Sequence, residues 1–416
     1  MAFDLVLKNG MLVDGTGSPA RRADVAVQGG VIAEVGDVRD GADRVIDASD
    51  LVVAPGFVDH HTHYDAQICW DRTTSCSPWH GVTSVVMGNC GVGLAPCRPE
   101  AREIAAWDLV NVEAIPFEVL SAGISWDWET FPEYMDAAAR RGTGPNLGFL
   151  APLTPFRHYV MGEDSMERAA DAAETDHIAG LLREAMNAGA LGFSTTYGPQ
   201  HIGYQGRPLA CRQASRDEIE AYCGVLRELG KGTVQLNLNA RPGEVDADEQ
   251  ALIEGIMTAS QRPVTWLALL VRDDQPDVCR KTLEQTKALL DRGARPQISC
   301  RPFIMQIDLK NPFAFGSQPA WQPVFNKSVE EQMQIYRDPA FRQAARDSMQ
   351  TGFFNRLDVH FTECESLQGL VGKTINEIAE EHFEDKLFGL RKELLEVLPE
   401  YLSLKRIRGV LIESED

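Results

Sequence analysis

The first fifty residues alternate short apolar runs with pairs of turn-forming residues. The runs are two or three residues long, and Asn9-Gly10, Asp14-Gly15 and Gly29-Gly30 separate several of them. Such pairs favour tight turns between antiparallel strands. The pattern therefore predicts a small antiparallel β unit over residues 1–54. Its expected strands are Leu5–Leu7, Met11–Val13, Val25–Val27, Val31–Ala33 and Val45–Ile46.

From Leu51 onward, longer apolar runs alternate with amphipathic stretches, which is typical of βα units around a parallel sheet. The candidate strands are Val52–Asp59, Val82–Gly88, Leu147–Pro152, Ala190–Ser194, Thr233–Asn239, Val264–Leu270 and Pro296–Pro302. Predicted helices between them include His177–Ala188, Arg216–Leu229, Asp248–Ala259 and Arg280–Arg292. This pattern predicts an α/β fold, a (β/α)₈ TIM-type barrel lacking one strand, over residues 55–382.

Two segments stand outside this alternation. Residues 97–145 follow the second predicted strand and are rich in aromatic side chains, which favours a lid or a substrate wall over a simple connection. Residues 383–416 are amphipathic and charged, and we interpret them as an atypical helical tail. A barrel without its eighth strand would expose sheet edges. Either the tail or a partner in a homo-oligomer would cover them.

Charge and cysteine content limit the partners and the compartment. The 416 residues include 40 Lys and Arg against 61 Asp and Glu, a net charge of −21. Nucleic acids and anionic membranes need clustered positive charge, so this balance argues against both as partners. The nine cysteines include no CxxC pair, which favours a reducing compartment. Because Asp4 stands where a signal peptide is basic, the sequence predicts a cytoplasmic protein.

Two histidines separated by one residue follow the first predicted barrel strand. Side chains alternate along a strand, so Asp59, His61 and His63 would share one face. Both imidazoles would then point into the barrel mouth and bind one divalent metal, for which Zn²⁺ is well suited. Asp59 or Asp65 would orient the two rings. A histidine cluster at a surface turn is the alternative, and the preceding apolar strand favours the metal site.

Cys90 follows the next predicted strand, within Gly88-Asn89-Cys90-Gly91. Adjacent barrel strands deliver their functional side chains to the same end of the barrel. A thiolate at this position would complete a His/His/Cys metal site, whereas a free cysteine is otherwise usually a small buried hydrophobe. The surrounding glycines lack the GxGxxG pattern and the lysine of a phosphate-binding loop.

These motifs resemble a known family. Gly56–Asp65, Gly81–Gly91 and Gly189–Thr195 are similar to segments of the amidohydrolase superfamily, specifically its D-aminoacylase (N-acyl-D-amino-acid deacylase) branch. The resemblance extends over roughly residues 3–380, and Gly88-Asn89-Cys90-Gly91 is its most specific part. Trp126–Tyr134 resembles a divergent group within that branch.

Several properties follow from the resemblance alone. It implies a β-sandwich portion beside a metal-bearing barrel that holds one or two divalent ions, with the cysteine as a ligand. The metal would polarise an amide carbonyl and activate water, and an aspartate on the last strand would transfer the proton. Related cyclic amidases bridge two metals with a carboxylated lysine on strand four. No lysine lies between Lys8 and Lys231, which excludes that type of site.

The sequence also departs from the family pattern, which has histidines at the ends of strands five and six and an aspartate on strand eight. The fifth and sixth predicted strands contain no histidine, and Asn239 offers only an amide oxygen. His201, after the fourth strand, is a candidate substitute ligand or acid/base, although a loop histidine is often only solvated. Asp358 is the candidate late acid. The chain after residue 382 does not match the family pattern and resembles a truncated or altered C-terminus.

Two functions remain open on this basis. The first is a metal-dependent amidohydrolase that cleaves the C–N bond of a small-molecule amide, such as an N-acyl-D-amino acid, with Zn²⁺ on His61, His63 and Cys90. The second is a non-catalytic family member, or a truncated product, that keeps the fold without the proton-transferring aspartate. A serine hydrolase is disfavoured because the chain lacks a GxSxG motif.

Overall fold

The computed structural model describes residues 2–238, 243–271, 275–299, 304–307, 309–348, 357–359, 365–374, 377 and 410–413. The chain divides into two compact units. The first consists of residues 1–59 and 76–84, and the second consists of residues 60–75 and 85–416. Among the described residues, no helix combines the length and the apolar character needed to cross a membrane.

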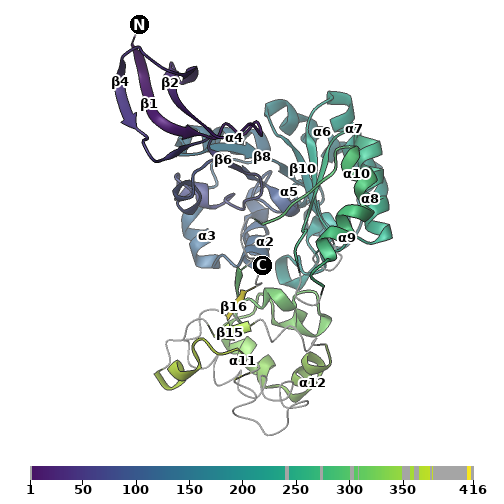
Figure 1. Cartoon of the computed structure of the whole chain (residues 1–416). Helices are drawn as coiled ribbons and strands as arrows, with labels where there is room; N and C mark the ends of the chain where they lie inside the picture. Colours follow the sequence, from purple (N-terminus) through teal and green to yellow (C-terminus); the bar gives the residue numbers. More distant parts are fainter. Residues whose placement is uncertain are drawn as a thin grey trace. The chain divides into compact units, whose positions relative to one another are not determined.

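The first unit is built on a mixed β-sheet (Figure 1). Its strands are β1 (Phe3–Leu12), β2 (Arg21–Gln28), β3 (Val31–Gly36), β4 (Ala42–Asp47) and β5 (Val52–Val53). The strand order is β3-β2-β1-β4, and β5 also pairs with β1. The prediction of antiparallel pairing is confirmed for β1 to β3, but β4 and β5 run parallel to β1. The reason is that residues 37–41 carry the chain back across the sheet to the far edge of β1.

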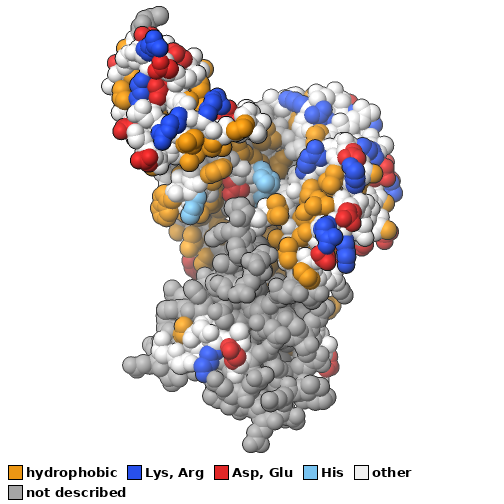
Figure 2. Space-filling model, in the orientation of Figure 1, with side chains coloured by type: hydrophobic (Ala, Val, Ile, Leu, Met, Phe, Trp, Pro, Cys, Tyr) orange, Lys and Arg blue, Asp and Glu red, His pale blue; other side chains and the backbone are white. Residues whose placement is uncertain are grey.

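The Asn9-Gly10 pair is not a turn between two strands, as the sequence pattern predicts. It lies inside the ten-residue strand β1, where the register with β2 shifts between Leu7 and Gly10. Asn9 has a φ of 64°, which the small polar Asn side chain tolerates, so the pair forms a bulge. Hydrophobic residues remain exposed on β3 and β4, among them Val31, Ile32 and Val45. Figure 2 shows hydrophobic side chains among the charged ones on the visible face of the first unit.

The second unit contains a five-stranded parallel sheet of order β13-β12-β11-β10-β9. Its strands are β9 (Ala151–Pro152), β10 (Gly192–Thr196), β11 (Thr233–Asn237), β12 (Val264–Leu267) and β13 (Arg295–Pro296). Separately from that sheet, the chain forms a three-stranded sheet of order β6-β7-β8, with β6 (Phe57–Asp59), β7 (Val82–Met87) and β8 (Asn146–Phe149), which is not confined to the second unit. Residues 146–152 belong to both sheets, because β8 pairs in one and β9 in the other. Strands β7 to β13 therefore follow one another in chain order.

Helices connect the parallel strands, and α6, α7 and α8 lie along one side of the sheet (Figure 1). The helices of this region are α5 (Leu153–Met161), α6 (Ala172–Ala188), α7 (Arg216–Leu229), α8 (Ala247–Ser260), α9 (Val278–Gln285) and α10 (Lys287–Asp291). The helix predicted over residues 216–229 is confirmed, and a capping box of Ser215 and Glu218 fixes its start. The helix predicted over residues 280–292 is broken at Thr286, whose hydroxyl donates to the Thr282 carbonyl at 2.7 Å.

The predicted first barrel strand, Val52–Asp59, is divided. Its start, β5, pairs with β1, and its end, β6, belongs to the sheet that contains β7, with Pro55-Gly56 between them. Proline lacks the N–H that a continuous ladder needs. The alternation of parallel strands with helices is a TIM-barrel-like α/β architecture, and closure into an eight-stranded barrel stays a prediction.

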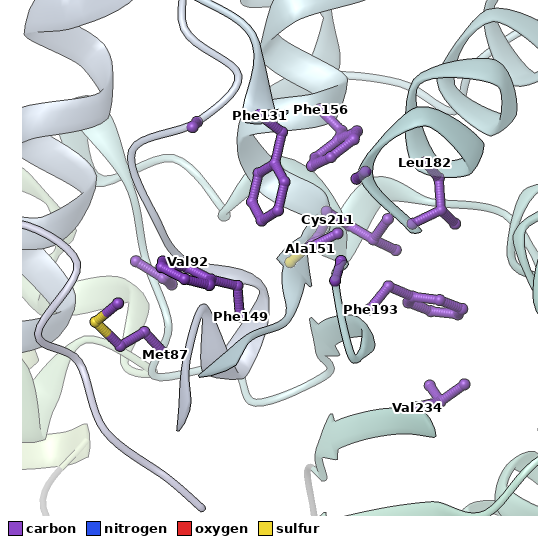
Figure 3. Packing of buried hydrophobic residues seen from close by; sticks show 14 of the residues in the cluster. Met87, Val92, Phe131, Phe149, Ala151, Phe156, Leu182, Phe193, Cys211 and Val234 are labelled. Atoms are coloured by element: carbon purple, nitrogen blue, oxygen red, sulfur yellow. The ribbon is translucent and has the colours of Figure 1, made fainter. Parts of the chain in front are cut away.

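Residues 97–145 fold into helices. These are α2 (Arg102–Glu113), α3 (Phe117–Gly123) and α4 (Phe131–Arg141). Trp128, Phe131 and Tyr134 are buried, and the Tyr134 hydroxyl donates to the Asp65 carbonyl at 2.9 Å. Figure 3 shows Phe131 in the core with Phe149 and Phe193 of the parallel strands. The segment thus belongs to the main core. Glu113, the last residue of α2, contributes to the site described below.

The chain beyond β13 begins with β14 (Ile304–Ile307), continues through α11 (Val329–Arg337) and α12 (Pro339–Ser348), and reaches β15 (Leu357–Val359). Within the predicted helical tail, Val410–Glu413 forms strand β16, which pairs antiparallel with both β14 and β15. The structure differs from the helical prediction there because Val-Leu-Ile favours an extended backbone once strands are available on both sides. The other residues of the tail lie outside the described part.

Candidate metal centre

Three potential metal ligands converge in the second unit, namely His61, His63 and Cys90. Their ligand atoms all lie within 4.8 Å of one another. The histidines follow the end of β6, and between them Thr62 turns the other way, with its hydroxyl donating to the Val86 carbonyl at 2.8 Å. Alternation along this extended stretch therefore places both imidazoles on one side, as the sequence spacing predicts.

Cys90 lies in a tight turn that follows β7. Gly88, Cys90 and Gly91 all have left-handed backbone conformations, with φ of 75°, 57° and 72°. A side chain at Gly88 would place its Cβ only 2.1 Å from the Leu150 carbonyl oxygen, so only glycine fits there. The Cys90 N–H donates to Gln235 Oε1 at 2.6 Å, which holds a conformation that cysteine does not favour by itself.

Two of the three separations between the ligand atoms are close to those of a tetrahedral metal site. His61 Nε2 lies 3.3 Å from His63 Nε2 and 3.4 Å from Cys90 Sγ. Around a tetrahedral Zn²⁺ at ordinary bond lengths, two imidazole nitrogens stand about 3.3 Å apart, and a nitrogen and a thiolate sulfur about 3.6 Å apart. The donor set and its spacing therefore fit Zn²⁺, with one coordination position left for water or substrate.

Each imidazole has an oxygen facing its outer nitrogen. His61 Nδ1 donates to Gln297 Oε1 at 2.7 Å. His63 Nδ1 lies 3.4 Å from Glu113 Oε1, which is longer than an ordinary hydrogen bond. An acceptor at Nδ1 favours the tautomer in which Nε2 carries the lone pair. Both Nε2 atoms are therefore directed toward the common point with Cys90.

Burial shapes the electrostatics of the centre. It lowers the pKa of His63 to about 4 and raises the pKa of the Cys90 thiol well above its ordinary value. It also raises the pKa of Glu113 to about 8 and that of Asp65 to about 7. Desolvation thus favours the neutral form of each group. A divalent cation would supply the opposite charge that stabilises a thiolate and carboxylates in such surroundings.

The structure places the two predicted aspartates differently. Asp65 is buried, and its carboxyl accepts the Gly88 N–H at 3.4 Å, so it lies against the turn that carries Cys90. Asp59 is the last residue of β6 and belongs to the first compact unit. Its role in orienting the rings stays a prediction.

His201 lies outside the three-residue cluster. It is buried, and both of its ring nitrogens lie 3.2 Å from Asn237 Nδ2, which donates to one of them. Burial, followed by the nearby His63, Arg212 and His61, lowers the pKa of His201 to about 3. The ring is therefore neutral near pH 7, and its burial disfavours protonation. Asp358 is in β15, but its side chain lies outside the described residues.

Three residues near the centre were missed by the sequence reasoning, namely Gln235, Gln297 and Glu113. The two glutamines are buried, and their amide oxygens contact Cys90 and His61. Their Nε2 groups have no hydrogen-bond partner among the described residues, so each is a donor available to a ligand. A glutamine within a predicted buried strand is the available signal, because a buried amide needs a partner.

Comparison with known proteins identifies the family. Residues 44–350 match the family model described as "Amidohydrolase family", which covers most of the chain. The chain therefore belongs to the amidohydrolase family, and the predicted resemblance is confirmed.

Similar proteins include a D-aminoacylase of Alcaligenes xylosoxydans xylosoxydans, 39% identical over 194 residues, which is 46% of this chain and 37% of that protein. An N-acyl-D-aspartate deacylase of the same organism is 34% identical over 255 residues, which is 61% of this chain and 47% of that enzyme. The chain thus matches less than half of the length of each of these relatives.

Solved structures extend the likeness over the whole fold. A crystal structure of D-aminoacylase is 25% identical, with a TM-score of 0.63, and the match covers 99% of this chain and 72% of that one. An N-acyl-D-glutamate deacylase from Bordetella bronchiseptica, complexed with zinc and a phosphonate inhibitor, is 21% identical with a TM-score of 0.61, covering 100% of this chain and 72% of that one. The second likeness concerns the fold alone.

Proposed function

We propose that this protein is a metal-dependent amidohydrolase that cleaves the C–N bond of a small N-acylated amino acid, such as an N-acyl-D-amino acid. The observation that carries the proposal is the convergence of His61 Nε2, His63 Nε2 and Cys90 Sγ at tetrahedral spacing. The similarity to D-aminoacylase and to N-acyl-D-aspartate deacylase supports the substrate class.

In this proposal His61, His63 and Cys90 hold Zn²⁺. A bound Zn²⁺ polarises the amide carbonyl and makes hydroxide available near neutral pH. Three protein ligands leave a position open for those two oxygens. A D-aminoacylase of similar fold has a binuclear metal centre, so the number of ions, one or two, is part of what metal analysis will decide.

The remaining polar groups bind substrate and move protons. The Nε2 groups of Gln235 and Gln297 donate toward oxygens of the substrate, since the described residues offer them no other partner. His201 stays neutral because burial lowers its pKa to about 3, so proton transfer to the leaving amine is assigned to Asp358. We propose a (β/α)₈ barrel as the complete architecture, because this fold gathers functional groups from several strands at one end.

A non-catalytic family member is the second candidate. The observation in its favour is β11, where the family pattern has a histidine near the strand end and this chain has Gln235 and Asn237. Asn237 already donates to Thr196 Oγ1 at 3.0 Å and to the His201 ring, so it is committed to the protein. This candidate predicts that the ion is bound but that no amide is hydrolysed.

A Ser-His-Asp chain elsewhere in the unit does not support serine hydrolysis. Ser165 Oγ lies 2.8 Å from His158 Nδ1, and His158 Nε2 lies 3.0 Å from Asp108 Oδ2. All three residues are buried, and Ser165 also donates to the Gly162 carbonyl at 2.6 Å. No substrate reaches a fully buried hydroxyl, so this chain of hydrogen bonds is structural.

Metal analysis combined with an amide-hydrolysis assay tests the proposal. Purified protein loaded with Zn²⁺ should bind the ion and release amino acid from N-acyl-D-amino acids faster than from their L-enantiomers. Cys90→Ala should lose both the ion and the activity, whereas Cys223→Ala, a buried cysteine outside the centre, should keep both. Binding without turnover of any N-acyl amino acid would favour the non-catalytic candidate, and absence of binding would contradict both.

A further inference from the structure

Glu113 is the last residue of α2, and it is the carboxylate that faces His63 Nδ1. We propose that Glu113 is a positioning residue, which the helical insertion brings to the metal centre to orient His63. This inference rests on the proposed metal-dependent function. It gives residues 97–145 a role in supporting the metal centre, whereas the sequence predicts only a lid or a substrate wall.

The geometry places Glu113 on the outer side of the ring. Its Oε1 lies 3.4 Å from Nδ1, while Nε2 on the opposite side of the imidazole faces His61 Nε2 at 3.3 Å. A carboxylate at the outer nitrogen keeps the proton there, fixes the ring plane and makes the inner nitrogen a better donor to a metal. From this position Glu113 acts through His63.

The two histidines are supported in different ways. His61 faces the neutral amide of Gln297, whereas His63 faces an acidic side chain. Gln297 follows β13 of the parallel sheet, and Glu113 ends α2 of the insertion. The insertion therefore supplies the outer partner of His63.

The helix that carries Glu113 is fixed by buried polar contacts. Asp108 contacts His158 of α5 at 3.0 Å and accepts the Tyr204 N–H at 2.8 Å. Asn111 donates to the Gly203 carbonyl at 2.6 Å and exchanges two hydrogen bonds of 3.0 Å with Asn326. A positioning carboxylate needs such a rigid support, because a loosely held one would not fix the ring.

The sharpest test compares the Zn²⁺ affinity of three variants of the full chain, measured by competition with a chromophoric chelator. Glu113→Gln keeps an acceptor oxygen but removes the charge, and Glu113→Ala removes both. Zn²⁺ affinity should fall about 10- to 100-fold for Glu113→Ala, with a smaller loss for Glu113→Gln. Glu103→Gln makes the same chemical change at an exposed position of α2 and should leave the affinity within twofold.

A second readout separates positioning from general stability. The visible absorption of Co²⁺-loaded protein reports the ligand field. The spectrum should shift in both Glu113 variants but not in Glu103→Gln. The melting temperatures of the metal-free variants should equal that of the metal-free wild type. Unchanged affinity and spectrum in Glu113→Ala would overturn the inference while leaving the proposed function intact. If the wild-type chain bound no Zn²⁺ or Co²⁺, the proposed function itself would fail.

Discussion

The hydrogen bond from the Cys90 N–H to Gln235 Oε1 predicts that a residue on β11 controls metal affinity from outside the ligand set. Cys90 has a φ of 57°, and an L residue in this left-handed region costs about 1–2 kcal/mol. The 2.6 Å hydrogen bond to a fully buried Gln235 offsets that cost. Gln235→Leu removes the acceptor and keeps a side chain of similar size.

Two opposing effects decide the expected change in stability. Leaving the buried Cys90 N–H without an acceptor costs about 1–3 kcal/mol. The substitution also removes the Gln235 Nε2 group, which is buried without a partner among the described residues, and this recovers a similar amount. The unfolding free energy should therefore change little.

Metal affinity should respond more strongly, since only the left-handed form of the turn directs Cys90 toward the two histidines. Losing about 1–2 kcal/mol of support for that form lowers Zn²⁺ affinity roughly 5- to 30-fold. Competition with a chromophoric chelator measures this change, and Gln343→Leu on the exposed side of α12 is the matched control. Affinity within twofold of wild type for Gln235→Leu would refute the reasoning.

Two further substitutions test the turn and the surface electrostatics. Gly88→Ala should lower stability by about 2–5 kcal/mol in urea unfolding, because its Cβ would lie 2.1 Å from the Leu150 carbonyl oxygen at a φ of 75°. Gly180→Ala in α6, where a Cβ meets nothing within 4 Å, should not destabilise, and equal effects would contradict the account. Hydrogen bonds from Arg168 lower the pKa of Glu174 from 4.5 to about 2, so its stabilisation is present above pH 4.5 and is lost as the pH falls toward 2. Glu174→Gln should therefore lower the melting temperature at pH 7, with a difference that shrinks below pH 4.5, and a pH-independent difference would argue against this ion pair.

Much of the fold follows from local sequence patterns. The helix over residues 216–229 has a clear capping box and an apolar stripe, and its observed bounds are those predicted. The Asn9-Gly10 bulge and the division of Val52–Asp59 between two sheets were not predictable in this way. Both depend on which strands lie alongside, and local turn signals do not report pairing over long distances.

The site likewise contains residues that sequence patterns predict and residues that they do not. His61, His63 and Cys90 could be brought together from sequence because alternation and strand order place them at adjacent strand ends. Glu113 could not, since it lies fifty residues beyond His63 in the chain and approaches the ring only through the fold of the insertion. Sequence patterns do not single out Gln235 and Gln297, because glutamine is not a typical metal ligand and these amides contact the ligands rather than replace them.

The central claim is that Cys90 and the two histidines bind one metal together, and zinc K-edge X-ray absorption of the Zn²⁺-loaded protein tests it most directly. The account predicts one sulfur scatterer at about 2.3 Å and nitrogen or oxygen scatterers at about 2.0–2.1 Å. Cys90→Ser should lose the sulfur contribution. A shell of nitrogen and oxygen alone in the wild-type protein, or a sulfur signal that persists in Cys90→Ser, would contradict the account.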